Sequence, residues 1–325
     1  MNRTGILIIS PNWLGDVVMA LPAVRALREK NPNARIAALA KKAVAPLWDM
    51  CGFADEIIVL PKGNFATFAM GDTLRGRGFE TAYILPNSFR SALIAFIAGI
   101  PKRRGAKSGD WRRWMLNDAV DLKDLKHAHQ SEEYGRILEV SVGRVSDPSI
   151  KINKTGRVGD PSYIVLIPGA ARGDSKRWPF FAEAARLILK RRPQTRFLVC
   201  GAVAESGLCH EVAENIGKAA ESVAGKTNLK EFAAILAGAE LVVCNDSGGM
   251  HLASALGTPV VAVYGLTDPV KTGPIGANAL VIRPEGIEKS SRDIARESAA
   301  AAAALRSITP ERVAEAALWK LKVES

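Results

Sequence analysis

The first half of the chain alternates short, continuous apolar runs with longer segments in which apolar residues recur every third or fourth position. The short runs predict buried strands, and the periodic segments predict helices that pack on them. The expected strands are 6–10, 34–40, 56–60, 81–85 and 103–105, and the expected helices are 15–30, 44–50, 65–77, 88–98 and 129–142. This alternation is typical of a parallel sheet covered by helices on both faces.

A polar stretch with glycine and proline interrupts this alternation, which then starts again. Residues 153–162 have no apolar period and predict a linker. The strands expected beyond it are 163–167, 196–200, 241–244 and 260–264, and the helices are 180–191, 204–216, 229–237, 252–256, 299–304 and 309–323. We therefore expect two α/β domains, residues 1–155 and 156–325, with the last helix in the second domain or packed back on the first.

Composition agrees with a cytoplasmic α/β protein. Of 325 residues, 48% are hydrophobic and only 6% are aromatic, which fits α/β layers better than a β-sandwich. No apolar run approaches the roughly 20 residues that a membrane span needs. The run 6–9 is too short for the apolar region of a signal peptide. The four cysteines have no Cys-x-x-Cys spacing, so we expect buried free thiols.

The net charge of +11 is concentrated in the first half of the chain. One segment holds seven basic residues and a single acid: Arg90, Lys102, Arg103, Arg104, Lys107, Arg112 and Arg113, with Asp110. Such a segment suits a nucleic acid, a membrane surface or a phosphorylated substrate, and the alternative is a solvated basic face. Aromatic residues are not interleaved on strands as stacking platforms, which disfavours a nucleic acid.

Polar loops follow several predicted strands, which is where open α/β sheets bind their ligands. The loop 10–16 ends in Asp16, within the first turn of a helix. Its carboxylate is either a general base for an attacking hydroxyl or a favourable charge at a helix N-terminus. The loop 168–179 carries Lys176 and Arg177 without the spacing of a P-loop. Lys176 is therefore either a phosphate contact or a solvated lysine.

The loop 245–251, which reads Asn-Asp-Ser-Gly-Gly-Met-His, is the most informative segment of the chain. It joins an apolar strand to the start of a helix, whose backbone N–H groups suit a phosphate. Asp246 is placed to fix the loop or a sugar hydroxyl, and Ser247 to hold a phosphate oxygen together with the glycine amides. His251 is either a ligand contact or a helix cap.

Two other kinds of site are disfavoured. No Asp-x-Asp pair is present to hold a divalent metal on a nucleotide sugar. His127 and His129 lack carboxylate or cysteine neighbours, so we interpret them as surface or acceptor-side residues rather than as metal ligands. No Gly-x-Gly-x-x-Gly follows the first strand, which argues against a nicotinamide dehydrogenase.

Six motifs, in order along the chain, resemble the ADP-heptose:lipopolysaccharide heptosyltransferases of glycosyltransferase family 9, and most of all the heptosyltransferase II group. They are Asn-Trp-Leu-Gly-Asp-Val-Val-Met at 12–19, Leu-Pro-Asn-Ser-Phe-Arg-Ser-Ala at 85–92, Ala-Gly-Ile-Pro at 98–101, Leu-Asn-Asp at 116–118, Lys-Arg-Trp-Pro at 176–179 and the loop 245–251. Residues 284–306 depart from the pattern, because they lack the cysteines that many heptosyltransferase II chains carry there.

The resemblance implies a GT-B fold: two Rossmann-like, doubly wound domains with the active site in the cleft between them. It also implies an inverting transfer without a metal or cofactor. Asp16 would be the general base, and Lys176 would neutralise the diphosphate as ADP leaves. The implied donor-binding residues are Lys176, Arg177, Asp246, Ser247, Gly248, Gly249, Met250 and His251. The implied acceptor-binding residues are Asn12, Trp13, Asn87, Ser88, Arg90, Arg103, Arg104, Arg112 and Arg113.

The implied substrates are ADP-L-glycero-D-manno-heptose, bound by the second domain, and a heptose hydroxyl of the anionic lipid A–core of lipopolysaccharide, bound by the first. We expect peripheral contact with the cytoplasmic face of the inner membrane through loop 106–115, which carries Trp111 and Trp114. Two alternatives stay open. One is a GT-B glycosyltransferase with another sugar donor or core position, and the other is a non-catalytic protein that binds a nucleotide sugar or an anionic glycan.

Overall fold

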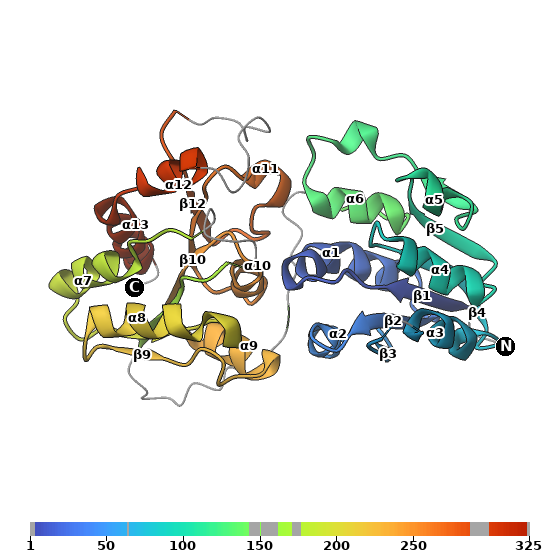
Figure 1. Cartoon of the computed structure of the whole chain (residues 1–325), viewed down its shortest axis with the longest axis horizontal. Coiled ribbons are helices and arrows are strands. Elements are labelled where there is room, and N and C mark those ends of the chain that lie inside the picture. Colours follow the sequence, from blue (N-terminus) through green and yellow to red (C-terminus); the bar gives the residue numbers. More distant parts are fainter. Residues whose placement is uncertain are drawn as a thin grey trace. The chain divides into compact units, whose positions relative to one another are not determined.

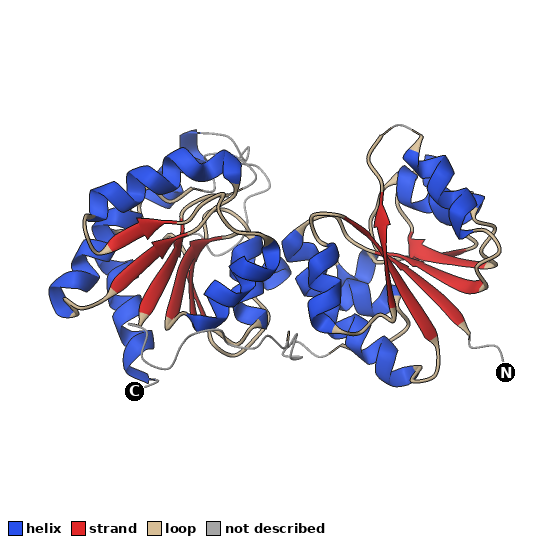
Figure 2. Ribbon diagram, turned by 90° about the horizontal axis from the view of Figure 1, so that it is seen from below, coloured by secondary structure: helices blue, strands red, loops and turns tan. Residues whose placement is uncertain are grey.

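The computed structural model describes residues 4–63, 65–142, 150, 162–170, 177–286 and 299–323. The chain folds as two compact units, Met1–Pro148 and Ser149–Ser325. Each unit contains one six-stranded sheet with helices on both of its faces (Figure 1 and Figure 2). Of the predicted linker 153–162, residues 153–161 lie outside the described residues.

The first unit is built on an entirely buried central strand. Its strands are β1 Gly5–Ile9, β2 Arg35–Lys41, β3 Glu56–Leu60, β4 Phe79–Ile84, β5 Lys102–Ala106 and β6 Asp118–Val120. Its helices are α1 Leu14–Lys30, α2 Ala45–Cys51, α3 Ala66–Leu74, α4 Phe89–Ile97, α5 Asp110–Arg113 and α6 Gln130–Ile137, with a 3₁₀ turn η1 at Lys123–Leu125. In the sheet core, Leu7 of β1 pairs with Ala37 of β2 and Ala82 of β4, whose small side chains complete the same buried cluster.

The second unit repeats this plan with a core of its own. Its strands are β7 Tyr163–Ile167, β8 Arg196–Val199, β9 Ala220–Ser222, β10 Leu241–Asn245, β11 Val260–Val263 and β12 Ala279–Ile282. Its helices are α7 Phe181–Arg191, α8 Ser206–Ile216, α9 Leu229–Gly238, α10 Gly248–Ala255, α11 Pro269–Thr272, α12 Ala299–Arg306 and α13 Pro310–Val323, with a 3₁₀ turn η3 at Val203–Glu205. Asn228 caps α9, and Glu231 completes a capping box.

Both sheets have the strand order of a doubly wound Rossmann domain. The orders are β3-β2-β1-β4-β5-β6 and β12-β11-β10-β7-β8-β9, and all the neighbouring strands are parallel. The direction of winding reverses between β1 and β4 in the first unit and between β7 and β10 in the second. Ligands of such folds bind beyond the carboxyl ends of the strands at this reversal.

Differences from the predicted elements concern short pieces and ends. The elements that were not expected are β6, β9, β12, α5 and α11, each of three or four residues. A periodic pattern cannot show in so few positions. Helix α6 ends at Ile137 instead of 142, just before Glu139 takes a left-handed φ of 58°. Helix α10 begins at Gly248 instead of 252, because Ser247 in an extended conformation caps it.

The last helix belongs to the second unit. Val313, Ala314 and Ala317 of α13 are buried in the same core as Trp178 and Phe181, and α13 packs on α7, β10 and β11. The apolar face of α13 is therefore part of the core of the second unit.

The state of the cysteines agrees with the sequence. All four cysteines are free thiols, of which Cys200, Cys209 and Cys244 are buried and Cys51 is half-buried. Burial raises the pKa of the Cys209 thiol to about 11. Within the described ranges, no helix is both long and apolar enough to cross a membrane.

Candidate functional site

Two loops leave the same edge of the first sheet at its reversal point. One follows β1 and carries Asn12 and Trp13, and the other follows the adjacent parallel strand β4 and carries Asn87 and Ser88. Trp13 is 59% exposed, and Asn87 is exposed as well. The hydroxyl of Ser88 accepts the Ser91 N–H at 3.2 Å, so this side chain caps α4. The edge therefore offers polar and aromatic side chains at the place where such folds bind ligands.

Asp16 lies half-buried in the first turn of α1, beside α6. The Nε2 atom of Gln130 donates to its Oδ1 at 3.2 Å and to the Tyr134 hydroxyl at 2.8 Å. Burial raises the pKa of Tyr134 well above its usual value, and the negative charge of Asp16 adds to the rise. A neutral amide thus fixes one carboxylate oxygen of Asp16. Sequence reasoning missed Gln130, because 114 positions separate the two residues and only the packing of α6 on α1 joins them.

Two of the arginines predicted to bind an acceptor are used inside the first unit. Arg103 donates from Nη1 to the Ile100 carbonyl at 2.7 Å and from Nε to the Met115 carbonyl at 2.8 Å. Arg104 pairs with Asp118 at 2.6 Å, and its Nε donates to the Ile137 carbonyl at 3.0 Å. Both guanidinium groups therefore hold strands and helix ends together.

Arg112 is also an internal residue, only 2% exposed. Its Nη1 donates to the Ala106 carbonyl at 2.6 Å, to Ser108 Oγ at 3.0 Å and to Asn87 Oδ1 at 3.3 Å. Its Nε and Nη2 are buried without a partner in the described part of the chain, and desolvation lowers the pKa of Arg112 to about 10. Its guanidinium lies against β5, where a Cβ at Gly105 would come within 2.7 Å of Nη2.

The predicted basic acceptor face is thus smaller than the sequence indicated. Arg103, Arg104 and Arg112 do not present their charges to a ligand in this structure, because carbonyl groups, Asp118 and burial engage them. Arg113 is exposed, and Arg90 is half-buried. Of the predicted arginines, these two have side chains that solvent can reach.

In the second unit, the reversal point brings together the ends of β7 and β10. Asn245, the last residue of β10, is fully buried and bonds to backbone groups of the loop that follows β7. That loop contains Lys176, which lies outside the described residues together with 171–175. Arg177, just after them, is half-buried.

The start of α10 forms the other side of this edge. Ser247 has φ −147° and ψ 168° and precedes the first helical residue Gly248. Its hydroxyl oxygen is buried and has no hydrogen-bond partner among the described residues. A Cβ at Gly249 would lie 2.7 Å from Ile167 Cδ1, so glycine lets the helix approach β7 closely. The first N–H groups of a helix lack intrahelical partners and suit an anion.

Two residues of the predicted donor set face the core. Met250 is fully buried, and its sulfur lies 3.4 Å from the Tyr264 hydroxyl, which also donates to the Thr272 carbonyl at 2.8 Å. His251 is 4% exposed. Burial raises the pKa of Tyr264 well above its usual value, and the charge of Asp246 adds to the rise. Through its contact with Met250, the buried Tyr264 supports the loop 245–251, a role that the sequence did not reveal.

The second unit therefore offers a helix start beside the buried Ser247 hydroxyl, and the first offers an oriented carboxylate. Neither offers a metal site: among the described residues, no group of three or more His, Cys, Asp or Glu side chains is arranged to hold an ion. His129 instead caps α6, accepting the Ser131 N–H on Nδ1 at 3.2 Å.

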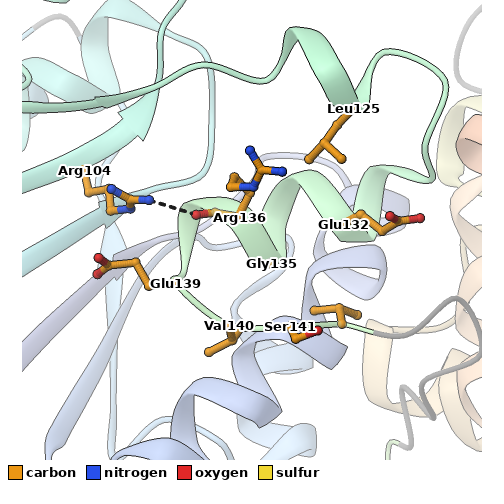
Figure 3. A pocket seen from close by; sticks show the side chains of 9 residues that line it. Arg104, Leu125, Glu132, Gly135, Arg136, Glu139, Val140 and Ser141 are labelled. Atoms are coloured by element: carbon orange, nitrogen blue, oxygen red, sulfur yellow. Dashed lines mark hydrogen bonds between the residues drawn. The ribbon is translucent and has the colours of Figure 1, made fainter.

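An open pocket of about 450 Å³ lies elsewhere in the first unit, at the end of α6 (Figure 3). It is lined by Arg104, Leu125, Glu132, Gly135, Arg136, Glu139, Val140, Ser141 and Val142. Three of its charged groups already pair: Arg136 with Asp124 at 2.8 Å, Glu139 with Lys102 at 2.7 Å and Arg104 with Asp118 at 2.6 Å. With most of its charges compensated inside the protein, the pocket is a poor candidate for an ionic ligand.

Known proteins match the chain over most of its length. A model of glycosyltransferase family 9 (heptosyltransferase) matches residues 67–301. The chain is 33% identical to lipopolysaccharide heptosyltransferase 2 of Escherichia coli K12, over 95% of this chain and 96% of that protein. It is 31% identical to lipopolysaccharide heptosyltransferase 2 of Salmonella typhimurium LT2, over 86% and 87%.

Solved structures of heptosyltransferases have the same fold as this chain. The structure of E. coli ADP-heptose lipopolysaccharide heptosyltransferase II matches with a TM-score of 0.83 and 28% identity, over 99% of both chains. E. coli heptosyltransferase WaaC with ADP matches with a TM-score of 0.77 and 21% identity, over 98% of this chain and 100% of that chain. The predicted GT-B fold is confirmed.

Proposed function

The chain belongs to glycosyltransferase family 9, the heptosyltransferases, and we propose that it transfers heptose from ADP-L-glycero-D-manno-heptose to a heptose hydroxyl of the lipopolysaccharide inner core. The observation that carries this proposal is the 33% identity with E. coli heptosyltransferase 2 over 95% of the chain. The reaction inverts the anomeric centre and uses no metal ion.

On the acceptor side, Asp16 removes the proton from the attacking hydroxyl. The oxygen then bonds to the anomeric carbon of the donor while the bond from that carbon to the diphosphate breaks. The geometry that supports this role is the hydrogen bond from Gln130 Nε2 to Asp16 Oδ1. It orients the carboxylate, and a neutral amide leaves its charge intact for proton transfer.

On the donor side, the leaving ADP needs its negative charge stabilised. The N-terminal amides of α10 at Gly248 and Gly249, together with the unpartnered Ser247 hydroxyl, suit the diphosphate oxygens. Lys176 and Arg177 supply positive charge from the loop after β7. Asp246 and His251 complete the donor set, and Met250 supports it from the core.

The acceptor contacts that we propose are Asn12, Trp13, Asn87, Ser88, Arg90 and Arg113, all from the two loops and the basic segment of the first unit. Arg90 and Arg113 would pair with the carboxylates or phosphates of the lipid A–core. Arg112 acts indirectly, because its Nη1 holds Asn87 Oδ1 at 3.3 Å. Arg103 and Arg104 likewise shape the segment rather than bind the acceptor.

We also propose that the first unit rests on the cytoplasmic face of the inner membrane through an aromatic surface made of Phe89, Phe96, Trp111 and Trp114. Trp111 is 83% exposed and Trp114 is 59% exposed. The rings of Phe96 and Trp114 touch edge to face at 4.9 Å, so helices α4 and α5 present one continuous surface. Amphipathic aromatic side chains beside an exposed arginine suit the interface of an anionic bilayer.

The test is incubation with ADP-heptose and truncated core acceptors, with ADP release and product mass as readouts. We expect Asp16→Ala to lower kcat by about 10²–10⁴-fold, because a positioned base contributes that much, while ADP-heptose affinity stays unchanged. Release of ADP only with another sugar donor or core position would move the chain to that specificity. Absence of ADP release with every heptose acceptor would overturn the proposal.

A further inference from the structure

We propose that Ser10 is a positioning residue that holds the loop between β1 and α1 in the shape that the acceptor and Asp16 require. The proposal rests on the proposed function for the role of Asp16, whereas the bonds that hold the loop are observed directly. Ser10 is the first residue after β1 and is only 4% exposed. Its hydroxyl accepts the indole N–H of Trp48 at 2.9 Å and donates to the Pro11 carbonyl at 2.9 Å.

Trp48 gives this chain of two hydrogen bonds a fixed starting point. It lies in α2, the helix that follows β2, and its side chain is fully buried. The backbone N–H of Ser10 donates to the Leu39 carbonyl of β2 at 2.9 Å, so the backbone of Ser10 is held as well. The Ser10 hydroxyl therefore has a defined direction, from the indole of Trp48 toward the Pro11 carbonyl.

The bond to the Pro11 carbonyl fixes more than one atom, because the loop is short and partly rigid. Residues 10–13 are all that lie between β1 and α1. The proline ring fixes φ of Pro11, and a residue before proline is restricted to extended conformations. Since a peptide group is planar, holding the Pro11 carbonyl also sets the direction of the Asn12 N–H. The bonds of Ser10 therefore set the course of the chain toward the proposed acceptor contacts Asn12 and Trp13.

The same loop connects Ser10 to the general base. Trp13 is the N-cap of α1, with φ −111° and ψ 145°, and its carbonyl accepts the Val17 N–H at 3.0 Å. Asp16 lies within the turn that this bond closes, so a shift of Trp13 moves Asp16 with it. Gln130 orients the side chain of Asp16, whereas Ser10 sets the position of its backbone. A misplacement of about 1 Å in a catalytic site can cost about 10²-fold in rate.

The direct test follows the Trp48 indole by ¹⁵N-tryptophan NMR, which is simple here because the chain has six tryptophans. Ser10→Ala removes only the hydroxyl group. We expect hydrogen exchange of the Trp48 indole N–H to become at least about tenfold faster, because the N–H loses its acceptor. The Trp178 indole donates to the Ile308 carbonyl at 2.8 Å in the second unit. It is the control within the same spectrum and is expected to keep its protection.

The functional readouts are kcat/KM for the acceptor, from ADP release, and the dissociation constant of ADP, from calorimetry. We expect Ser10→Ala to lower kcat/KM for the acceptor at least about tenfold, while the ADP dissociation constant stays within about twofold of the wild type. The matched control is Ser254→Ala, which is expected to alter neither quantity. Ser254 is buried near the end of α10, and its hydroxyl also donates to a backbone carbonyl, that of Ile275, at 2.7 Å.

A double-mutant cycle with Trp48→Phe, which removes the indole N–H and keeps an aromatic ring, tests whether the two bonds act as one chain. If they do, the double variant loses no more activity than Ser10→Ala alone. Losses that multiply, unchanged exchange of the Trp48 indole, a smaller loss of acceptor kcat/KM than expected, or a parallel weakening of ADP binding would each overturn the proposal. A wild-type protein that releases no ADP with any heptose acceptor would instead refute the proposed function, whatever the exchange shows.

Discussion

At the scale of single residues, the contact between Gln130 and Asp16 leads to a kinetic prediction. Gln130→Met removes the 3.2 Å hydrogen bond to Asp16 Oδ1 with little change of volume. We expect kcat to fall about 10–100-fold, because a misoriented catalytic group loses that much rate, while ADP-heptose affinity stays the same. Steady-state kinetics of ADP release measure both quantities.

The control for this variant is Tyr134→Phe, which removes the other partner of the Gln130 amide and leaves the bond to Asp16 in place. Its kcat is expected to stay within about threefold of the wild type. Equal losses in the two variants would mean that packing between α1 and α6, and not orientation of the carboxylate, sets the rate.

The residue types in the sequence predicted which segments carry candidate site residues, but not which of their side chains are available to a ligand. The arginines of the basic segment have the same composition signal, yet Arg112 is buried beside Asn87 and Arg104 pairs with Asp118. The partner of Arg104 is set by β5 and β6 lying side by side, which no local pattern encodes. Asp16 and Ser247 were predicted as site residues because each lies where a strand leads into the next helix, at the edge of the sheet that binds ligands in such folds.

At the scale of elements, the end of α6 supplies a prediction on pH. Glu139 adopts a left-handed φ of 58° and accepts hydrogen bonds from Tyr83 at 2.9 Å and Lys102 at 2.7 Å. Burial favours its neutral form, but the bonds from Lys102 and Tyr83 prevail and hold the pKa of Glu139 below its ordinary value. A lowered folded-state pKa contributes stability above the ordinary carboxyl range, and that stability is lost as the pH falls through the lowered value.

We therefore expect Glu139→Gln to lower Tm by roughly 2 °C at neutral pH, since a partly exposed ion pair contributes less than about 1 kcal/mol. The difference from the wild type should disappear once acid protonates Glu139 in the folded protein. Glu29→Gln, at an exposed ion pair with Arg25, serves as the control and is expected to leave Tm unchanged. Thermal melting monitored by circular dichroism at several pH values measures the difference in Tm. A difference that persists undiminished in acid would contradict the assignment.

Elements with a long periodic pattern were predicted, and those without one were missed. The exact bounds of β3 and β7 follow from unbroken apolar runs. Strands β6, β9 and β12 exist because a neighbouring strand offers them backbone partners, so their cause lies in the sheet and not in their own sequence. The start of α10 was placed four residues late, because glycine has a low helix propensity and two glycines stand at 248 and 249. The close packing of Gly249 on Ile167 explains why glycine occurs there.

At the scale of the whole molecule, the aromatic surface of the first unit predicts membrane binding. We expect the double variant Trp111→Ala, Trp114→Ala to bind vesicles of anionic phospholipid at least tenfold more weakly, because the loss of two exposed indole rings removes several kcal/mol of interfacial contact. Vesicle co-sedimentation measures the binding. Trp319→Ala, which removes a 55% exposed tryptophan from the second unit, is the control and should bind as the wild type does.

Undiminished vesicle binding by the double variant would remove the aromatic surface from the proposal. In that case ADP release with a water-soluble, lipid-free acceptor should also be equal in variant and wild type. Under the membrane proposal, the double variant releases ADP as fast as the wild type with the soluble acceptor, but more slowly when the acceptor is embedded in vesicles. The two assays together separate membrane docking from damage to the site.

The place of α13 in the second core has a consequence for how the protein is made. Val313 and Ala317 complete the cluster around Trp178 and Phe181, and the Ile308 carbonyl completes the bonding of the Trp178 indole. The first unit has all of its strands by Val120, so it can fold on the ribosome while synthesis continues. The core of the second unit can close only after its last helix, α13, has been synthesised. During that interval its apolar strands are the part of the nascent chain most exposed to aggregation and most in need of a chaperone.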